Sequence, residues 1–254
     1  MKTILTIVFV GLLSTLTFGQ VRTIHVFVAL CDNEHQGIVP VPKSLGNGKD
    51  PNNNLYWGAA FGVQSYFKNK TTDWKLLSSL KPNNPVILER LLFKQESKDI
   101  YMLADAYDGE KIKTCVENFL KASNGQNPIQ VTYNSLKLKF SGNANLIAYL
   151  GHNGLMDFKV NIKYDTTENN KKDVIILACY SKSYFSPEIR KTKANPILWT
   201  TNLMAPEAYT LKSAIDGWIL NESGAKIVER AAQTYNKYQK CGIKGARNLF
   251  TTEF

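Results

Sequence analysis

The stretch LIAYLGHNG, residues 146–154, carries the strongest indication of the fold. Its first part, 146–150, is a continuous apolar run, which is typical of a strand buried on both faces of a sheet. Gly151 ends this run, and His152, one of only 3 histidines in the chain, follows at once. We therefore expect a central strand whose carboxyl end presents a histidine.

Other segments alternate between strand and helix patterns around this stretch. A second run, 173–179, is equally apolar and ends in Cys179. The alternation predicts an α/β fold, a three-layer sandwich with a mostly parallel central sheet. In such sheets functional groups collect at the carboxyl ends of the strands, where His152 and Cys179 fall. The remaining predictions are strands at 23–31, 85–96, 99–107 and 195–202, helices at 55–69, 108–123, 206–223 and 225–239, and a long loop at 32–54.

The first twenty residues have the pattern of a secretory signal peptide. Lys2 supplies a positive start, and 4–13 is an apolar run that is short for a membrane span. We expect cleavage near Gly19 or Gln20, with an uncleaved membrane anchor as the alternative. The mature chain, 21–254, is then predicted to be a single domain without a membrane span, secreted or periplasmic, and its oligomeric state is left open.

Charge and cysteine content narrow the function classes. The formal charge is +10, but the lysines are spread along the chain without a dense basic tract, so a solvated basic surface is expected and specific nucleic-acid binding is not. Binding of nucleic acid or an anionic polysaccharide remains as an alternative carried by charge alone. The 4 cysteines are widely spaced without a CxxC pair, so we expect no metal site and no cofactor. A disulfide in an exported chain stays open.

His152 and Cys179 together suggest nucleophilic catalysis. A cysteine needs a neighbouring base to react as a thiolate, and an imidazole is a suitable partner. Two adjacent parallel strands would place both side chains over one edge of the sheet, and N–H groups near Gly154 and at Cys179 could stabilise an oxyanion. The alternative for each residue is structural, a buried small cysteine and a strand-end histidine.

The pair LIAYLGHNG and VIILACYSKSYF resembles the cysteine peptidases of the caspase–hemoglobinase fold: caspases, legumain, clostripain and, most of all, gingipain. In that family one apolar strand ends in His-Gly and a later one in Ala-Cys. The resemblance implies that Cys179 is the nucleophile, that His152 transfers the proton to the leaving group, and that Asn153 and Gly154 hold the oxyanion. Asn153 departs from the family, which has glycine directly after the histidine.

The same resemblance implies a substrate pocket and a function. The pocket would be lined by Trp199, Thr200, Thr201 and Asn202, with Asp32 and Asp50 as an acidic floor for a basic side chain. Each aspartate has an alternative role as a turn or capping residue. The function implied is an exported cysteine endopeptidase acting on peptides or proteins. The alternative is a catalytically inactive member of the fold that serves as a binding or scaffold protein, which Asn153 in place of glycine would favour.

Overall fold

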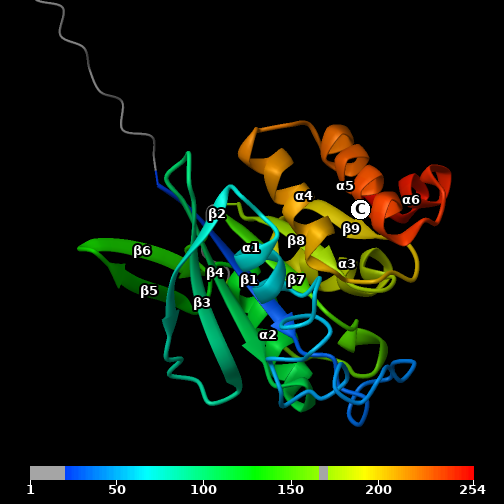
Figure 1. Cartoon of the computed structure of the whole chain (residues 1–254), viewed down its shortest axis with the longest axis horizontal. Helices are drawn as coiled ribbons and strands as arrows, with labels where there is room; N and C mark the ends of the chain where they lie inside the picture. The colour runs from blue at the N-terminus through cyan, green and yellow to red at the C-terminus, as the bar shows by residue number, and fades with distance from the viewer. Residues whose placement is uncertain (1–20, 166–170) are drawn as a thin grey trace, which may run out of the picture.

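The computed structural model describes residues 21–165 and 171–254, so the predicted signal peptide lies outside the described residues. The chain has an α/β fold with an eight-stranded, mixed and mostly parallel central sheet (Figure 1). The strand order is β10-β9-β8-β7-β1-β4-β3-β2. The strands are β1 Arg22–Ala29, β2 Trp74–Leu80, β3 Ile87–Gln95, β4 Ile100–Tyr107, β7 Leu146–Leu150, β8 Asp173–Leu177, β9 Asn195–Thr200 and β10 Phe250–Thr251.

The five central strands β9, β8, β7, β1 and β4 run parallel, while β2, β3 and β10 are antiparallel to their neighbours. β1, β7 and β8 are buried almost throughout, as continuous apolar runs in parallel sheets should be. The strands predicted at 23–31, 146–150, 173–179 and 195–202 are therefore confirmed, with ends that differ by a few residues.

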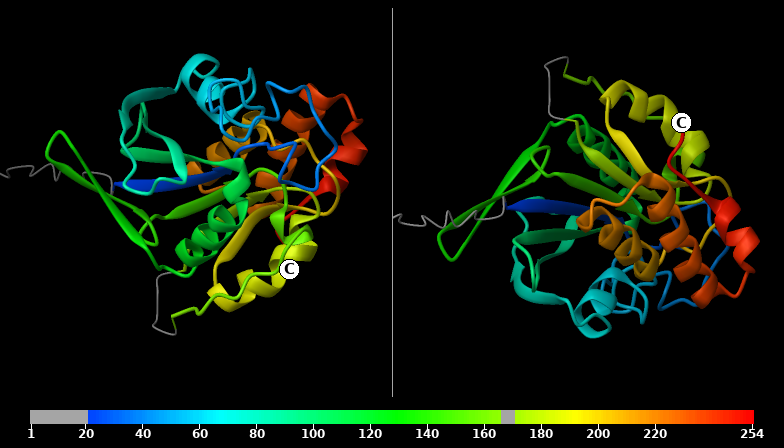
Figure 2. Two further views of the ribbon diagram at one scale, coloured as in Figure 1. Left: turned by 90° about the horizontal axis from the view of Figure 1, so that it is seen from below. Right: turned by 90° about the horizontal axis from the view of Figure 1, so that it is seen from above.

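Helices cover both faces of the sheet, as the two views in Figure 2 show. One core lies between the sheet and α1, α4 and α5, and a second lies between the sheet and α2 and α3. Alternate residues of β1 enter the two cores: Val26 and Val28 enter the first, Phe27 and Ala29 the second. The helices of the described chain are α1 Val63–Asn69, α2 Ile112–Ser123, α3 Ser181–Thr192, α4 Ala208–Ile219, α5 Gly224–Gln239 and α6 Ile243–Leu249.

The helix predicted over 55–69 is wrong in its first half. Only α1 is helical, and residues 55–62 form turns. A Cβ at Gly58 would collide with the backbone of residues 51 and 52, and a Cβ at Gly62 with the backbone of Trp57. The chain therefore folds back closely on itself in these turns and does not form a regular helix. These two glycines are also poor helix formers, and the predicted apolar spacing did not outweigh them.

A two-stranded hairpin, β5 Pro128–Tyr133 and β6 Leu136–Ser141, extends from the main sheet (Figure 1). Asn134 and Ser135 both have positive φ, which matches the tight turn that a two-residue hairpin connection requires. Leu138 of β6 is buried in a small third core with the outward face of β3 and β4. The two exposed lysines of β6, Lys137 and Lys139, project from the other side of the strand.

A charged network is buried where β1, β3 and β4 lie side by side. The Arg90 guanidinium donates two hydrogen bonds to Asp105, of 2.7 and 2.6 Å, and His25 Nε2 lies 3.0 Å from the same carboxylate. The Ser141 N–H donates to His25 Nδ1 at 3.1 Å, which makes Nε2 the protonated nitrogen of a neutral ring. Burial lowers the pKa of His25 more than Asp105 raises it.

The two edges of the sheet are irregular or short. β2 forms one edge, and its pairing with β3 shifts register between Leu76 and Ser78. β10 forms the other edge and has only 2 residues. No helix within the described residues is long and apolar enough to cross a bilayer.

Candidate active site

The parallel pairing of β7 with β8 places His152 and Cys179 side by side, just beyond the carboxyl ends of the two strands. Leu150 pairs with Leu177, and the Gly151 N–H donates to the Leu177 carbonyl at 3.2 Å. Gly151 has φ +149°, and a Cβ there would lie 2.8 Å from the carbonyl oxygen of Ala29 in β1. A glycine is therefore required where the chain leaves β7 and turns toward the cysteine segment.

His152 is held in place by a carboxylate and by its own backbone. The side chain is nearly buried, and its Nε2 lies 2.7 Å from Asp157 Oδ2. The same oxygen accepts the Gly37 N–H at 3.0 Å, and the Tyr149 hydroxyl donates to the His152 carbonyl at 2.7 Å. Because Nε2 faces the carboxylate, Asp157 favours the tautomer that leaves Nδ1 as the available base.

Asp157 is a site residue that the sequence reasoning missed. The sequence indicates Asp157 only by its position five residues after His152. In the structure it ends a short turn that includes the 3-10 segment Gly154–Met156. The Gly37 contact comes from the loop after β1, and a Cβ at Gly37 would lie 2.5 Å from Asp157 Oδ1. The histidine is thus positioned by residues that are far apart in the sequence.

Cys179 lies on a sharp turn between β8 and α3. Tyr180, the residue between the cysteine and the helix, has φ 50° and ψ 32°, a left-handed conformation that costs a non-glycine residue about 1 kcal/mol. The Cys179 side chain is half-buried. Its sulfur accepts the Met204 N–H at 3.4 Å and lies 3.6 Å from the Met204 carbonyl. Within the described chain, no hydrogen bond joins the thiol to the His152 ring.

Asn153 connects the histidine segment to the cysteine segment. This residue is fully buried, and its side-chain nitrogen donates a 2.6 Å hydrogen bond to the Cys179 carbonyl. Its side-chain oxygen accepts the Leu155 N–H at 3.1 Å and so caps the turn that carries Asp157. Asn153 therefore has a structural use for its amide that a glycine at this position could not provide.

Two backbone N–H groups of these segments have no acceptor among the described residues. The N–H groups of Asn153 and Cys179 donate to no protein atom in the part of the chain that the structure describes. The Gly154 N–H, by contrast, donates to the His152 carbonyl at 3.0 Å. Of the two residues predicted to hold an oxyanion, Asn153 has an unengaged N–H and Gly154 does not.

The four residues predicted to line the substrate pocket lie in different surroundings. Trp199 and Thr200 are fully buried. The Trp199 ring nitrogen donates to the Glu253 carbonyl at 2.8 Å, and the Thr200 hydroxyl bonds Ala178 and Ser181 beneath the cysteine turn. Thr201 donates to the Asn248 carbonyl at 2.7 Å. Asn202 lines a surface hollow of about 480 Å³.

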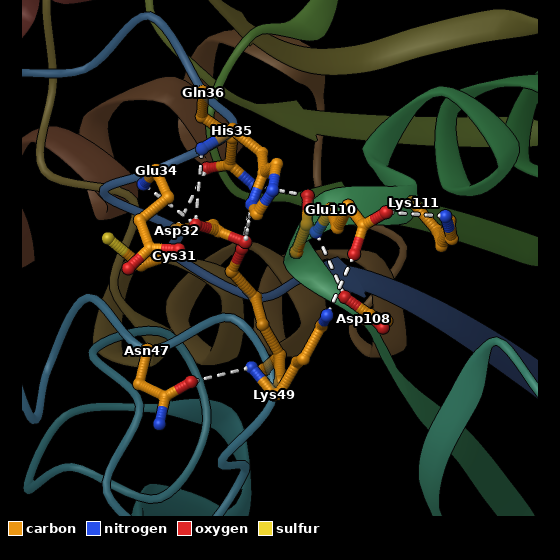
Figure 3. Close-up of polar contacts among 12 residues, drawn as sticks. Cys31, Asp32, Glu34, His35, Gln36, Asn47, Lys49, Asp108, Glu110 and Lys111 are labelled. Atoms are coloured by element: carbon orange, nitrogen blue, oxygen red, sulfur yellow. Dashed lines mark hydrogen bonds and ion pairs between the residues drawn. The ribbon is translucent and has the colours of Figure 1, made fainter.

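The two predicted aspartates both make turn contacts. Asp32 is buried, and its carboxylate lies 3.0 Å from His35 Nδ1. It also accepts the N–H groups of Glu34 and His35, and Figure 3 shows these side chains around it. Asp50 accepts the Asn52 N–H at 3.0 Å and the Asn53 side chain at 2.8 Å. These contacts match the turn and capping role that was the alternative for each.

Nearby ionisable groups are buried, and the cysteines are unpaired. Tyr56 is packed close enough to Cys31 and Cys179 for both to affect it, and burial raises its pKa well above the ordinary value. All four cysteines are free thiols. Among the described residues, no cluster of three or more histidine, cysteine or acidic side chains is arranged to hold a metal ion.

The chain matches no protein-family model, and searches of curated proteins and of solved structures return no match either. What the site does has to be inferred from its own residues.

Proposed function

We propose that this chain is a cysteine endopeptidase of the caspase–hemoglobinase type, with the three-layer arrangement of that fold. One observation carries the proposal: His152 and Cys179 directly follow the carboxyl ends of two adjacent parallel strands, β7 and β8, and a hydrogen bond from Asn153 joins the two segments. The orientation of His152 by Asp157 and the sharp turn that carries the half-buried Cys179 support the same reading.

In the proposed reaction Cys179 gives its proton to Nδ1 of His152, and the sulfur attacks the scissile carbonyl carbon. The N–H groups of Asn153 and Cys179 would stabilise the negative oxygen of the tetrahedral intermediate. His152 then protonates the departing amine, and a thioester remains on Cys179. Water, deprotonated by His152, hydrolyses the thioester and restores the thiol.

The Met204 N–H has a place in this mechanism. It points at the Cys179 sulfur, and a donor in this position stabilises a thiolate relative to a thiol. Met204 also belongs to the segment between β9 and α4, which includes Asn202 beside its surface hollow. We propose that substrate lies along this segment.

A second candidate function is a catalytically inactive binding protein with the same fold. The observation that favours it is the Cys179 sulfur, which contacts the Met204 backbone and makes no hydrogen bond to His152 within the described residues. In an active enzyme this contact would have to open or shift when substrate arrives.

The experiment compares the parent with Cys179→Ala on a diverse peptide library, with cleavage detected by mass spectrometry. Cys115→Ala is the matched control, because Cys115 lies on the buried face of α2. We expect cleavage by the parent and by Cys115→Ala, and none by Cys179→Ala. Equal cleavage by all three proteins would remove Cys179 from the mechanism.

A thiol probe separates the active from the inactive reading. Iodoacetamide is added near pH 7, and the labelled cysteines are located by peptide mapping. The exposed Cys241 provides an internal reference for a thiol with free access. Labelling of Cys179 faster than of Cys241 supports a catalytic thiol, and slower labelling together with no cleavage supports the inactive protein.

A further inference from the structure

A surface hollow lies at the other end of the sheet from Cys179. It measures about 930 Å³ and is bordered by residues at the amino ends of four strands: Arg22, Asn145, Asp173 and Asn195. We call it the basic basin. The basin borders the amino end of β8 at Asp173, whereas Cys179 follows the carboxyl end of the same strand. The length of β8, at about 3.3 Å per residue, therefore separates the basin from Cys179.

The basin is lined by an excess of cationic side chains. Lys137 and Lys139 come from the hairpin strand β6, Lys172 from the residues before β8, and Arg22 from the start of β1; Lys171 also borders it. Within residues 21–165 and 171–254, none of these four lysines has a carboxylate within ion-pair distance. Lys172 is half-buried, and the loss of water around it lowers its pKa.

The two carboxylates of the basin are already engaged by other groups. Asp173 accepts the side-chain nitrogen of Asn195 at 2.8 Å and the ring nitrogen of Trp218 at 2.9 Å. Glu222 pairs with Arg230 at 2.5 Å. Asp173 keeps its charge and interacts electrostatically with Arg22, while Glu222 is paired with Arg230 outside the lysine group. Two carboxylates therefore offset only part of the charge of Arg22 and four lysines, and the basin keeps a positive potential.

Arg22 is a lining residue of the basin whose position is fixed by several contacts. Its guanidinium donates to the Ile219 carbonyl at 3.1 Å and to the Asn221 side chain at 3.3 Å, and it stacks over the Trp218 ring at 4.2 Å. A cation fixed in this way loses little side-chain entropy when it binds an anion. The flexible lysines around it can follow the charges of an extended ligand.

The lining also indicates which kind of polyanion fits. Trp218 is the single aromatic ring among the described lining residues, and it is 7 % exposed with Arg22 across its face. Proteins that bind single-stranded nucleic acid use open aromatic faces on which bases stack, and the basin offers none. Its lining includes 4 asparagines and 4 lysines, whose side chains hydrogen-bond hydroxyl and sulfate groups.

We propose that the basic basin binds a sulfated polysaccharide chain, whose sulfate groups contact Arg22, Lys137, Lys139 and Lys172. The proposal is independent of the peptidase reading, since no residue of the basin belongs to the candidate active site. Binding at the basin would hold the protein on a sulfated surface and leave the carboxyl ends of the strands, where Cys179 lies, free.

The test measures binding of a size-defined, fully sulfated heparin oligosaccharide by calorimetry at several NaCl concentrations. The variant is Lys137→Gln/Lys139→Gln/Lys172→Gln, and the control of equal charge is Lys68→Gln/Lys75→Gln/Lys98→Gln, three exposed lysines elsewhere. We expect the basin variant to bind at least about tenfold more weakly and with a flatter salt dependence, and the control to change by less than about threefold. Circular dichroism checks that both variants fold.

Several results would overturn the proposal. Equal losses in the two triple variants would reduce the binding to general charge attraction. Stronger binding of a single-stranded oligonucleotide than of the oligosaccharide would point to nucleic acid. Binding of the desulfated oligosaccharide with the same affinity, or equally effective competition by inorganic sulfate at matched ionic strength, would rule out recognition of a sulfated chain. Labelling of Cys179 is expected to be the same in all variants.

Discussion

The side-chain nitrogen of Asn153 lies 2.6 Å from the carbonyl oxygen of Cys179, and this hydrogen bond joins the turn after β7 to the turn after β8. Asn153 is fully buried and Cys179 is half-buried, so this bond lies at the boundary between the core and the candidate site. Asn153 stands where the peptidases that this chain resembles have glycine after the histidine. The same residue connects the two halves of the candidate dyad.

Replacing Asn153 by glycine should destabilise the fold. We expect Asn153→Gly to lower the free energy of unfolding by about 1–3 kcal/mol, because it removes a buried donor and leaves the Cys179 carbonyl unpaired. Urea denaturation followed by circular dichroism measures the change. Asn69→Gly, at the exposed end of α1, controls for the effect of glycine on the backbone and should cost less. An equal loss in both variants would contradict a special role for the Asn153 amide.

Asp157→Asn tests whether the carboxylate positions His152. Asparagine can still accept the Gly37 N–H, but it no longer stabilises a protonated imidazole. If the chain is a peptidase, we expect kcat to fall at least about tenfold with KM nearly unchanged, since the residue acts on proton transfer. Asp99→Asn, on an exposed turn, is the control. A loss confined to KM would place Asp157 in substrate binding instead.

The buried His25 should make the protein less stable in mild acid. Burial lowers the pKa of His25 from 6.5 in the folded state, so below about pH 6.5 the unfolded chain binds a proton that the folded chain does not. Stability from this group is present above pH 6.5 and decreases as the pH falls, by at most about 1.4 kcal/mol per pH unit. Urea denaturation at pH 7.5 and 5.5 measures it.

A matched pair of histidine variants isolates that effect. His25→Gln should be less stable than the parent at pH 7.5 and should lose less stability on acidification. His35→Gln is the control for a substitution at an exposed loop histidine. The prediction is wrong if both variants respond to pH as the parent does.

Asp105→Asn should cause a larger loss than either histidine variant. Burial would raise the pKa of Asp105, but hydrogen bonds from Arg90 and His25 outweigh it and keep the pKa below its ordinary value. The amide would leave the Arg90 guanidinium without a counter-charge, at a cost of about 3–5 kcal/mol. Thermal unfolding at pH 7.5 measures this loss, and an unchanged midpoint would contradict it.

Two glycine-to-alanine variants should change stability in opposite directions. Gly151→Ala is expected to destabilise the protein, because the residue has positive φ and its Cβ would press on the Ala29 carbonyl. Gly245→Ala, inside α6 where a Cβ meets no atom within 4 Å, should stabilise it by about 0.5–1 kcal/mol. Thermal unfolding of the two variants beside the parent provides the comparison, and a stabilised Gly151→Ala would contradict the close contact.

The strands that present His152 and Cys179 could be predicted because doubly buried parallel strands have continuous apolar sequences. Helix α3 was missed, since Pro187 interrupts its pattern although Phe185 and Ile189 lie one turn apart on its buried face. The hairpin was missed although its Asn134-Ser135 turn and the buried alternate residues of β6 were visible in the sequence.

The site could be predicted less completely than the sheet. Histidine and cysteine at strand ends follow from local pattern, but the partner of each depends on how distant loops meet. Asp157 reaches His152 through a turn, and Met204 reaches Cys179 from the segment after β9. Trp199 and Thr200, which were expected in a pocket, are consecutive residues of β9 and point to opposite faces of the sheet. Both are buried because both faces are covered at this point, and the sequence of β9 alone does not show that.

The irregular edges of the sheet bear on how the protein behaves at high concentration. An open edge strand offers unpaired N–H and C=O groups to which another chain can add. At one edge the register shift of β2 and the exposed Lys75 make a continuous ladder with a second molecule unfavourable. At the other edge β10 is too short to offer more than a few such groups. The sheet should therefore resist growth into fibrils from either end, even though its central strands are among the most aggregation-prone segments of the chain.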